Sequence, residues 1–164
     1  MKMLKELLPY IIILLVVIVV RTFVVTPVKV DGSSMVPTLH DGDILILKKY
    51  DHNFKRFDVV VIDYTDTRLV KRIIGLPGES ISYRNNHLFI NGKKIDLKDY
   101  GFDTEDFDLS ELGYNKIPDD CYFVLGDNRD NSKDSRYFGP VKKEDIIGTT
   151  TYQVWPLNKL GKIN

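Results

Sequence analysis

Two adjacent serines lie in a short segment whose neighbours restrict the backbone. Residues 30–39 read VDGSSMVPTL, with Ser33 and Ser34 at the centre. Gly32 permits an unusual backbone angle and Pro37 fixes another, so the serines sit on a stiff turn that can present a hydroxyl group. Serines are common in turns, and this segment alone leaves open whether either hydroxyl is a nucleophile.

A lysine lies within an apolar strand pattern farther along the chain, where residues 69–79 read LVKRIIGLPGE. In a β-strand, Lys71 would share one face with Leu69 and Ile73, since side chains alternate between faces. The lysine is then either an edge-strand charge that prevents aggregation or a desolvated amine that is a free base near neutral pH. The residues by themselves favour the edge-strand charge.

A third segment concentrates polar and charged side chains directly after an apolar strand pattern. Residues 126–139 read GDNRDNSKDSRYFG. Their acidic spacing invites comparison with a calcium loop, but taking Asp130 as the first ligand puts Ser135 where glycine is needed and Val141 where glutamate is needed. A loop this polar is costly to fold unless its side chains organise one another or an active site.

Composition excludes several classes of function. The chain carries 23 basic and 23 acidic residues, with no long basic run, so we expect no nucleic-acid partner. Cys121 is the only cysteine, which rules out an intramolecular disulfide. His40, His52 and His87 have no ligand spacing with one another or with Cys121, so we expect no zinc site.

The N-terminal residues form a strongly apolar segment. Residues 7–20 carry no charge, and apolar residues resume after Arg21 as far as Val25. A helix over 7–25 would measure roughly 28 Å, close to the ~30 Å hydrocarbon core of a bilayer if Arg21 reaches the interface. We therefore predict a short cytoplasmic N-terminus at 1–6 and a single transmembrane anchor at 7–25.

Two alternatives to an anchor fit the N-terminal segment less well. A cleaved signal peptide would need a small-x-small cleavage site, which the following residues lack. A buried core helix would rarely be so uniformly apolar. The basic residues near the two ends are balanced, and the positive-inside rule therefore does not set the orientation.

Beyond the anchor, short β-branched runs separated by turn residues predict strands. These runs occupy residues 44–47, 57–64, 68–75, 81–95, 121–127 and 146–155. Asn91-Gly92 is a strong signal for a type I′ hairpin turn. We therefore predict a mainly β domain over 26–164, built as an antiparallel sheet or sandwich. Residues 96–116 are rich in Asp and Glu, and we expect an exposed acidic insert there.

The three polar segments, in this order and behind an N-terminal anchor, resemble the type I signal peptidases of bacteria, in the short form of Gram-positive species. The resemblance rests on GSSMVPTL, VKRIIGLPGE and GDNRDNSKDSRYFG, together with RFDVVVI at residues 56–62. It covers most of the chain from Arg21 to Trp155, and the acidic insert is the least matched part.

The resemblance implies a membrane-anchored serine endopeptidase with a signal-peptidase-type antiparallel β-sheet domain outside the cell. It would cleave N-terminal signal peptides from exported pre-proteins after small-x-small motifs, without a metal or organic cofactor. Expected partners are these pre-proteins, the lipid bilayer and, further, the protein export machinery. The cell membrane is the expected location, with a single pass.

The resemblance also assigns roles to individual residues. Ser34, next to Met35, corresponds to the nucleophile, and Lys71 to its general base; Ser33 is the wrong choice between the two serines. The Ser34 N–H belongs to the oxyanion hole. Some members add a hydroxyl two residues before the nucleophile, where this chain has Gly32, so a backbone group or Ser33 compensates, or the hole has one donor fewer.

Supporting residues follow from the same match. Ser132 corresponds to a residue that orients the lysine amine. Two ion pairs are expected, and shallow pockets for small substrate side chains should be lined by a further group of residues. The pairs are Asp127 with Arg72 and Asp134 with Arg136, and the pocket residues are Val30, Leu39, Leu69 and Val70.

Other classes of protein explain these residues less well. A catalytically inactive relative would have lost Ser34, Lys71 or Ser132, and all three are present. A soluble self-cleaving repressor uses the same Ser/Lys chemistry, but it would carry a DNA-binding module and no anchor. A conventional binding module would leave the polar segment at 126–139 unexplained.

Overall fold

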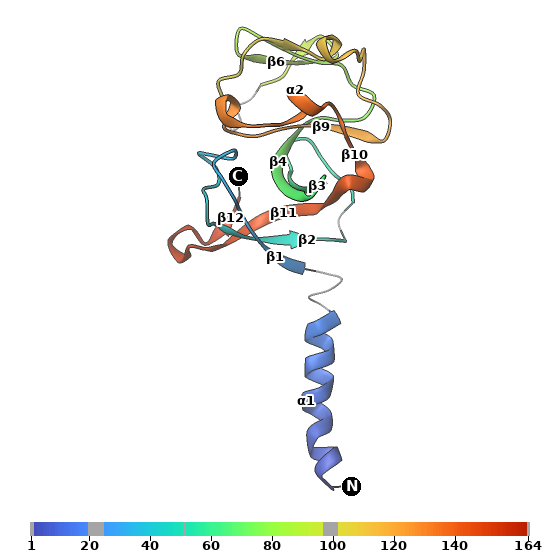
Figure 1. Cartoon of the computed structure of the whole chain (residues 1–164), viewed down its shortest axis with the longest axis vertical. Coiled ribbons are helices and arrows are strands. Elements are labelled where there is room, and N and C mark those ends of the chain that lie inside the picture. The colour runs from blue at the N-terminus through green and yellow to red at the C-terminus, as the bar shows by residue number, and fades with distance from the viewer. Residues whose placement is uncertain (1, 20–24, 51, 97–101, 164) are drawn as a thin grey trace.

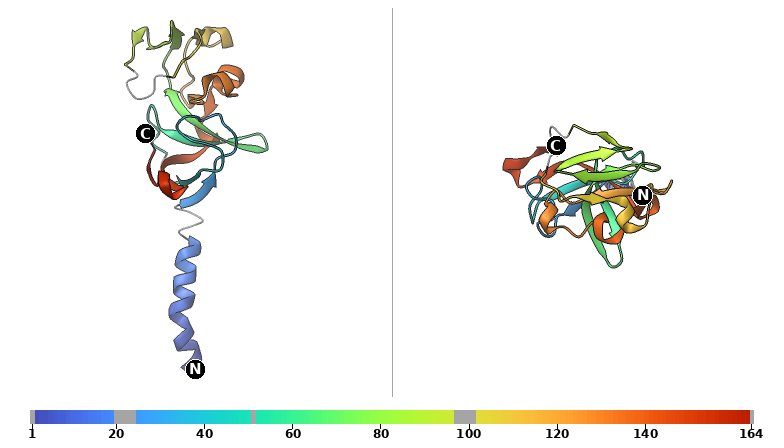
Figure 2. Two further views of the ribbon diagram at one scale, coloured as in Figure 1. Left: turned by 90° about the vertical axis from the view of Figure 1, so that its left-hand side faces the viewer. Right: turned by 90° about the horizontal axis from the view of Figure 1, so that it is seen from above.

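The structure, a computed structural model, describes residues 2–19, 25–50, 52–96 and 102–163. It consists of an N-terminal helix and two antiparallel β-sheets (Figure 1). The small sheet lies at the end of the large sheet that is farther from the helix (Figure 2). The prediction of a mainly β, antiparallel domain is confirmed.

Helix α1 (Lys2–Val19) carries its charged residues in its first five positions, and every residue after Glu6 is uncharged. Its large apolar side chains from Leu7 to Ile18 are 45–70% exposed, so none of them is packed against the β-domain. Among the residues that the structure describes, no helix meets both the length and the hydropathy needed to cross a membrane. Val25, expected at the end of the anchor, begins strand β1 because its backbone pairs with Lys48; residues 20–24 lie outside the described residues.

The large sheet has eight strands in the order β1-β2-β11-β3-β4-β9-β10, with β12 added to β11. Neighbouring strands are antiparallel throughout. The strands are β1 (Val25–Lys29), β2 (Ile44–Lys48), β3 (Val59–Tyr64), β4 (Thr67–Gly75), β9 (Cys121–Leu125), β10 (Val141–Lys142), β11 (Ile146–Trp155) and β12 (Gly161–Lys162).

The small sheet has the order β7-β6-β5-β8. Its strands are β5 (Ile81–Arg84), β6 (His87–Ile90), β7 (Lys93–Lys94) and β8 (Phe107–Asp108). Asn91 and Gly92 both have positive φ, 51° and 75°, as the predicted type I′ turn requires. Short helical turns complete the fold: η2 (Leu109–Leu112), η3 (Arg129–Asn131), α2 (Ser135–Phe138), η4 (Lys143–Asp145) and η5 (Leu157–Lys159).

The acidic insert is more than an exposed loop. Its carboxylates at Asp103, Glu105 and Asp106 are exposed as expected. However, Phe107 pairs with Tyr83 of β5, and Phe107 and Leu109 are buried in the core beneath the small sheet. The insert is thus exposed at its carboxylates and buried at Phe107 and Leu109, because apolar side chains among the acidic ones pack beneath the sheet.

Strands β3 and β4 lie at the centre of the large sheet and separate two apolar clusters. Val59 belongs to one cluster and Val60 to the other. Lys71 of β4 is opposite Val60, and Arg72 is opposite Val59. Directly paired residues share a face of the sheet, so Lys71 and Arg72 extend from opposite faces of the same strand.

Candidate active site

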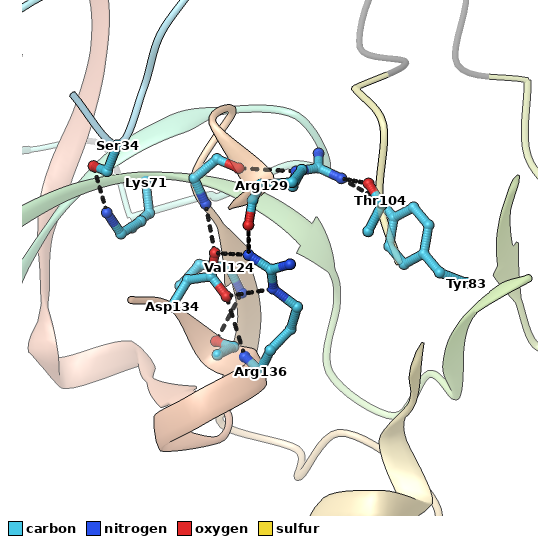
Figure 3. Close-up of polar contacts among 10 residues, drawn as sticks. Ser34, Lys71, Tyr83, Thr104, Val124, Arg129, Asp134 and Arg136 are labelled. Carbon is cyan, nitrogen blue, oxygen red and sulfur yellow. Dashed lines mark hydrogen bonds and ion pairs between the residues drawn. The ribbon is translucent and has the colours of Figure 1, made fainter. Parts of the chain in front are cut away.

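Ser34 and Lys71, 37 residues apart in the chain, meet at the centre of the site. Nζ of Lys71 lies 2.7 Å from Oγ of Ser34, a hydrogen-bond distance (Figure 3). Ser34 lies on the turn after β1, and Lys71 extends from β4. The pair has the reach that a nucleophile and its base require, 2.6–3.2 Å.

Lys71 is almost completely enclosed, with 2% of its surface exposed. Burial lowers the pKa of its amine from 10.5 to about 8, against the opposing effect of the Asp134 and Asp127 carboxylates. Burial penalises the charged form, since an ammonium loses its hydration shell. Lys71 is thus the desolvated amine of the two alternatives, and not an exposed edge-strand charge.

The serine turn, residues 32–39, is held by its own backbone and by two buried side chains. Val36 N–H donates to the Ser33 carbonyl, and Leu39 N–H donates to the Met35 carbonyl. Met35 and Leu39 are 0% exposed, which fixes the turn to the core. Gly32 has a φ of 84°, a left-handed angle at which a side chain would be strained.

Arg72 and Asp127 form a buried ion pair on the other face of β4. Nε and Nη2 of Arg72 donate to the two Asp127 oxygens at 2.9 and 2.7 Å, and the side chains are 1% and 0% exposed. Arg72 also donates to the Phe57 carbonyl. Such a pair is costly to break, since removing one partner leaves a buried charge. It fixes the start of the polar loop, residues 126–139, against the strand that carries Lys71.

Asp134 and Arg136 form the second expected ion pair, with Nε of Arg136 at 2.9 Å from Asp134 Oδ1 (Figure 3). Asp134 also accepts from the Arg136 N–H at the start of α2 and from the Gly126 N–H. Arg136 donates to the Arg129 carbonyl as well. The two charges therefore join both ends of the polar loop.

Arg129 was not singled out by the sequence, although it ties the polar loop to the acidic insert. Its Nε donates to the Gly126 carbonyl, and its Nη1 donates to the hydroxyls of Tyr83 and Thr104 (Figure 3). The guanidinium also lies over the Phe102 ring, 5.5 Å from its centroid. Nothing in the sequence indicates which distant hydroxyls a loop arginine will meet.

Comparison with known proteins places the chain in a family. The chain matches the family described as "Signal peptidase, peptidase S26" over residues 3–155. The chain belongs to this family. It is 41% identical to Signal peptidase I of Bacillus caldolyticus, over 92% of this chain and 91% of that protein. It is 42% identical to Signal peptidase I S of Bacillus subtilis (strain 168), over 90% and 86% of the two chains.

A solved family structure supports the fold directly. The crystal structure of a signal peptidase I from Enterococcus faecalis V583 superimposes with a TM-score of 0.55 at 38% sequence identity. The match covers 59% of this chain and 96% of that chain. The antiparallel β-domain described above is therefore a signal-peptidase-type fold.

Ser132 does not make the hydrogen bond expected of a residue that orients the lysine amine. Its side chain is buried at 8% exposure, and its Oγ has no hydrogen-bond partner among the described residues. The expected hydrogen bond to Lys71 is thus absent from the structure. Ser132 instead packs against Gly126, as the crowding around that glycine shows.

The four expected pocket residues are mostly core residues. Val30, Leu39 and Val70 are 2%, 0% and 9% exposed, and they pack in the same cluster as Met35 beside Ser34. Leu69 retains partial exposure. Since a fully buried side chain cannot touch a substrate, Leu39 is better described as support for the serine turn. No group of His, Cys, Asp and Glu with metal-site geometry occurs within the described ranges.

Gly126 leaves no room for a side chain, because Ser132 and the backbone of Ser34 both lie close to it. A Cβ at this position would lie 2.2 Å from Ser132 Oγ and 2.4 Å from the Ser34 carbonyl oxygen. We expect Gly126→Ala to displace the backbone of Ser34 and to lower kcat/KM by about tenfold or more, since small misplacements near reacting atoms are costly. Peptide cleavage assays of the folded variant measure the effect.

Gly148 provides a matched control for that variant. A Cβ there would lie 2.2 Å from the Lys48 carbonyl oxygen in the large sheet, a comparable clash at a position that contacts neither Ser34 nor Lys71. Gly148→Ala should lower the thermal unfolding midpoint while the folded enzyme keeps its kcat. Equal losses of kcat in the two variants would show that the Gly126 effect is not local.

Proposed function

We propose that this chain is the membrane-anchored serine endopeptidase that removes N-terminal signal peptides from exported pre-proteins. Membership in the signal peptidase family supports peptide cleavage of this kind. The single observation that carries the mechanism is the 2.7 Å contact between a buried lysine amine and the hydroxyl of Ser34. Ser34 is the nucleophile and Lys71 the general base.

In the acylation step, neutral Lys71 takes the proton of the Ser34 hydroxyl while Oγ forms a bond to the scissile carbonyl carbon. The resulting tetrahedral oxyanion is stabilised by the Ser34 N–H. The intermediate collapses with cleavage of the C–N bond, and the Lys71 ammonium returns the proton to the leaving amine. The mature protein departs with a new N-terminus, and the signal peptide stays esterified to Ser34.

In the deacylation step, Lys71 takes a proton from water as the water oxygen bonds to the ester carbon. The C–O bond to Ser34 then breaks, and Ser34 regains its proton from Lys71. A single base thus serves both halves of the reaction. The pKa of Lys71 is lowered from 10.5 to about 8. Deprotonation of the amine is therefore easier by about 3 kcal/mol in the protein than for a lysine side chain in water.

The substrate is an extended segment with small side chains at the first and third positions before the cut. Peptides of this kind bind by adding a strand to a sheet edge. Leu69 lies two residues before Lys71 in β4 and keeps partial exposure, whereas Val30 and Val70 are buried beside Met35. We propose that Leu69, with Val30 and Val70 packed behind the surface, limits the size of substrate side chains. Ser33, with Gly32 before it, remains the alternative source of a second oxyanion donor.

Residues 7–25 supply the anchor, with residues 1–6 in the cytoplasm and the domain from residue 26 outside the cell. The exposed apolar surface of α1 supports this proposal, because a helix that is apolar all round is stable only when buried in protein or lipid. Val25 is the exception, since it belongs to β1. Lipid, the pre-proteins and the export machinery are the proposed partners.

The dyad is tested by substitutions of similar size. Ser34→Ala and Lys71→Met should each lower the cleavage rate of a purified pre-protein by about 10³-fold or more, because each removes a group that acts in both chemical steps. Gel-based cleavage by the full chain in detergent measures the rate. Ser33→Ala is the control and should cost far less; full activity in either dyad variant would contradict the assignment.

The role of the anchor is tested by increasing the distance between the β-domain and the bilayer. A flexible Gly/Ser linker of about 20 residues inserted directly before Val25, at the boundary between the anchor and β1, would let the domain move roughly 25 Å from the bilayer. We expect the cleavage of a membrane-embedded pre-protein in vesicles to fall more than that of a soluble peptide. The same loss on both substrates would show that the insertion damages the domain and that proximity to lipid is not the cause.

A further inference from the structure

The polar loop holds the serine turn through the side chain and the backbone of one residue, Asn128. Its Nδ2 donates to the Ser33 carbonyl at 3.1 Å, and its backbone N–H donates to the Ser34 carbonyl at 3.0 Å. Two successive carbonyls on either side of the nucleophile are thus bound by a residue 94 positions away from Ser34. No expectation from the sequence concerned Asn128.

The Asn128 side chain does not cap the short helical turn that follows it. Asn128 is the N-cap residue of η3, a position where asparagine side chains commonly accept from the first turn of their own helix. Its side chain makes no such capping bond. The amide instead donates to the Ser33 carbonyl in the serine turn, so its contact is made with that turn and does not cap the start of η3.

The contact fixes the orientation of one peptide group. The Ser33 carbonyl and the Ser34 N–H belong to the same planar unit, and this peptide bond is trans. In a trans peptide the C=O and N–H point in opposite directions, so an amide that holds the carbonyl also aims the N–H away from itself. The Val36 N–H, 3.1 Å from the same carbonyl oxygen, supplies a second point of attachment.

The orientation of the Ser34 N–H is especially important in this chain because residue 32 is a glycine. Gly32 offers no side-chain hydroxyl two residues before the nucleophile, so stabilisation of the oxyanion depends on the Ser34 N–H. Preorganised donors stabilise a developing oxyanion without reorganisation at the moment of reaction. A hydrogen bond to the carbonyl of the same peptide also polarises the group and strengthens its N–H as a donor.

We propose that Asn128 is a positioning residue for the oxyanion hole, which it orients by holding the Ser33–Ser34 peptide through the Ser33 carbonyl. This role rests on the proposed function of Ser34 as nucleophile. Asn128 touches neither the substrate nor Lys71 in this account. It acts on the transition state through the direction of one backbone N–H.

Asn131 offers a comparison within the same loop. Its Nδ2 donates to the Ser33 hydroxyl at 3.0 Å, so it binds the side chain and not the peptide group of Ser33. Both asparagines join the polar loop to the serine turn, but only the Asn128 contact constrains the N–H of Ser34. An Asn131 variant therefore loosens the attachment of the polar loop to the serine turn, whereas an Asn128 variant also frees the orientation of the Ser33–Ser34 peptide.

The experiment compares Asn128→Asp, Asn128→Ala and Asn131→Ala in the full chain in detergent. Asn128→Asp keeps the shape and remains a good N-cap residue, but it cannot donate to the Ser33 carbonyl. We expect both Asn128 variants to lower kcat by about tenfold or more with KM within twofold, because substrate binding is untouched. Asn131→Ala should cost less than about threefold.

The affinity for a transition-state analogue distinguishes a positioning role from a purely structural one, because a purely structural role would leave it unchanged. A peptide aldehyde forms a tetrahedral adduct with a serine and places an oxygen in the oxyanion hole. Its inhibition constant should rise in the Asn128 variants by the same factor as kcat falls, while the pH at which activity is half-maximal stays that of the unaltered chain. Thermal unfolding of each variant verifies that the domain is folded.

The outcomes separate this role from the proposed function. If Ser34→Ala is inactive and both Asn128 variants keep the original kcat and aldehyde affinity, the positioning role is overturned and the dyad stands. If Asn131→Ala is as damaging as Asn128→Asp, orientation of the peptide is not the cause and the role is again overturned. An active Ser34→Ala variant would overturn the proposed function itself, whatever the asparagine variants do.

Discussion

The site contains one buried amine whose pKa is lowered although two carboxylates lie near it. Asp134 and Asp127 both favour the charged form of Lys71, yet burial outweighs them and the pKa falls to about 8. Each carboxylate is already bound to an arginine, Asp134 to Arg136 and Asp127 to Arg72. Both carboxylates are thus held in ion pairs, and the loss of hydration on burial is the largest influence on the pKa of the amine.

The polar loop makes this arrangement possible by joining parts of the fold that are distant in sequence. Its ion pairs attach it to β4 and to its own far end, and Arg129 attaches it to the small sheet. Gly126 allows the loop to approach the Ser34 carbonyl, a contact that a side chain would prevent. The cost of gathering so many polar groups is offset because nearly all of them bind one another.

The sequence predicted most of the strands and both ion pairs, because alternating apolar residues, an Asn-Gly turn and a recognisable family motif are local signals. It could not predict the pairing of Phe107 with Tyr83 or the contacts of Arg129 and Asn128, which depend on where distant segments meet. The hydrogen bond expected between Ser132 and Lys71 is absent, and Leu39 is core rather than pocket wall. A family motif conveys which residues gather at a site, but not every contact among them.

Direct titration of the Lys71 amine tests the central claim that burial lowers its pKa enough for it to act as a base. The full chain in detergent, labelled with ¹³C and ¹⁵N at lysine, would be titrated by NMR, and the Lys71→Met variant would assign the signal. We expect the Lys71 signal to titrate with a midpoint of about 8, below the ordinary lysine value of 10.5. A midpoint close to 10.5 would contradict the account, because the amine would then be charged at the pH where the enzyme must act.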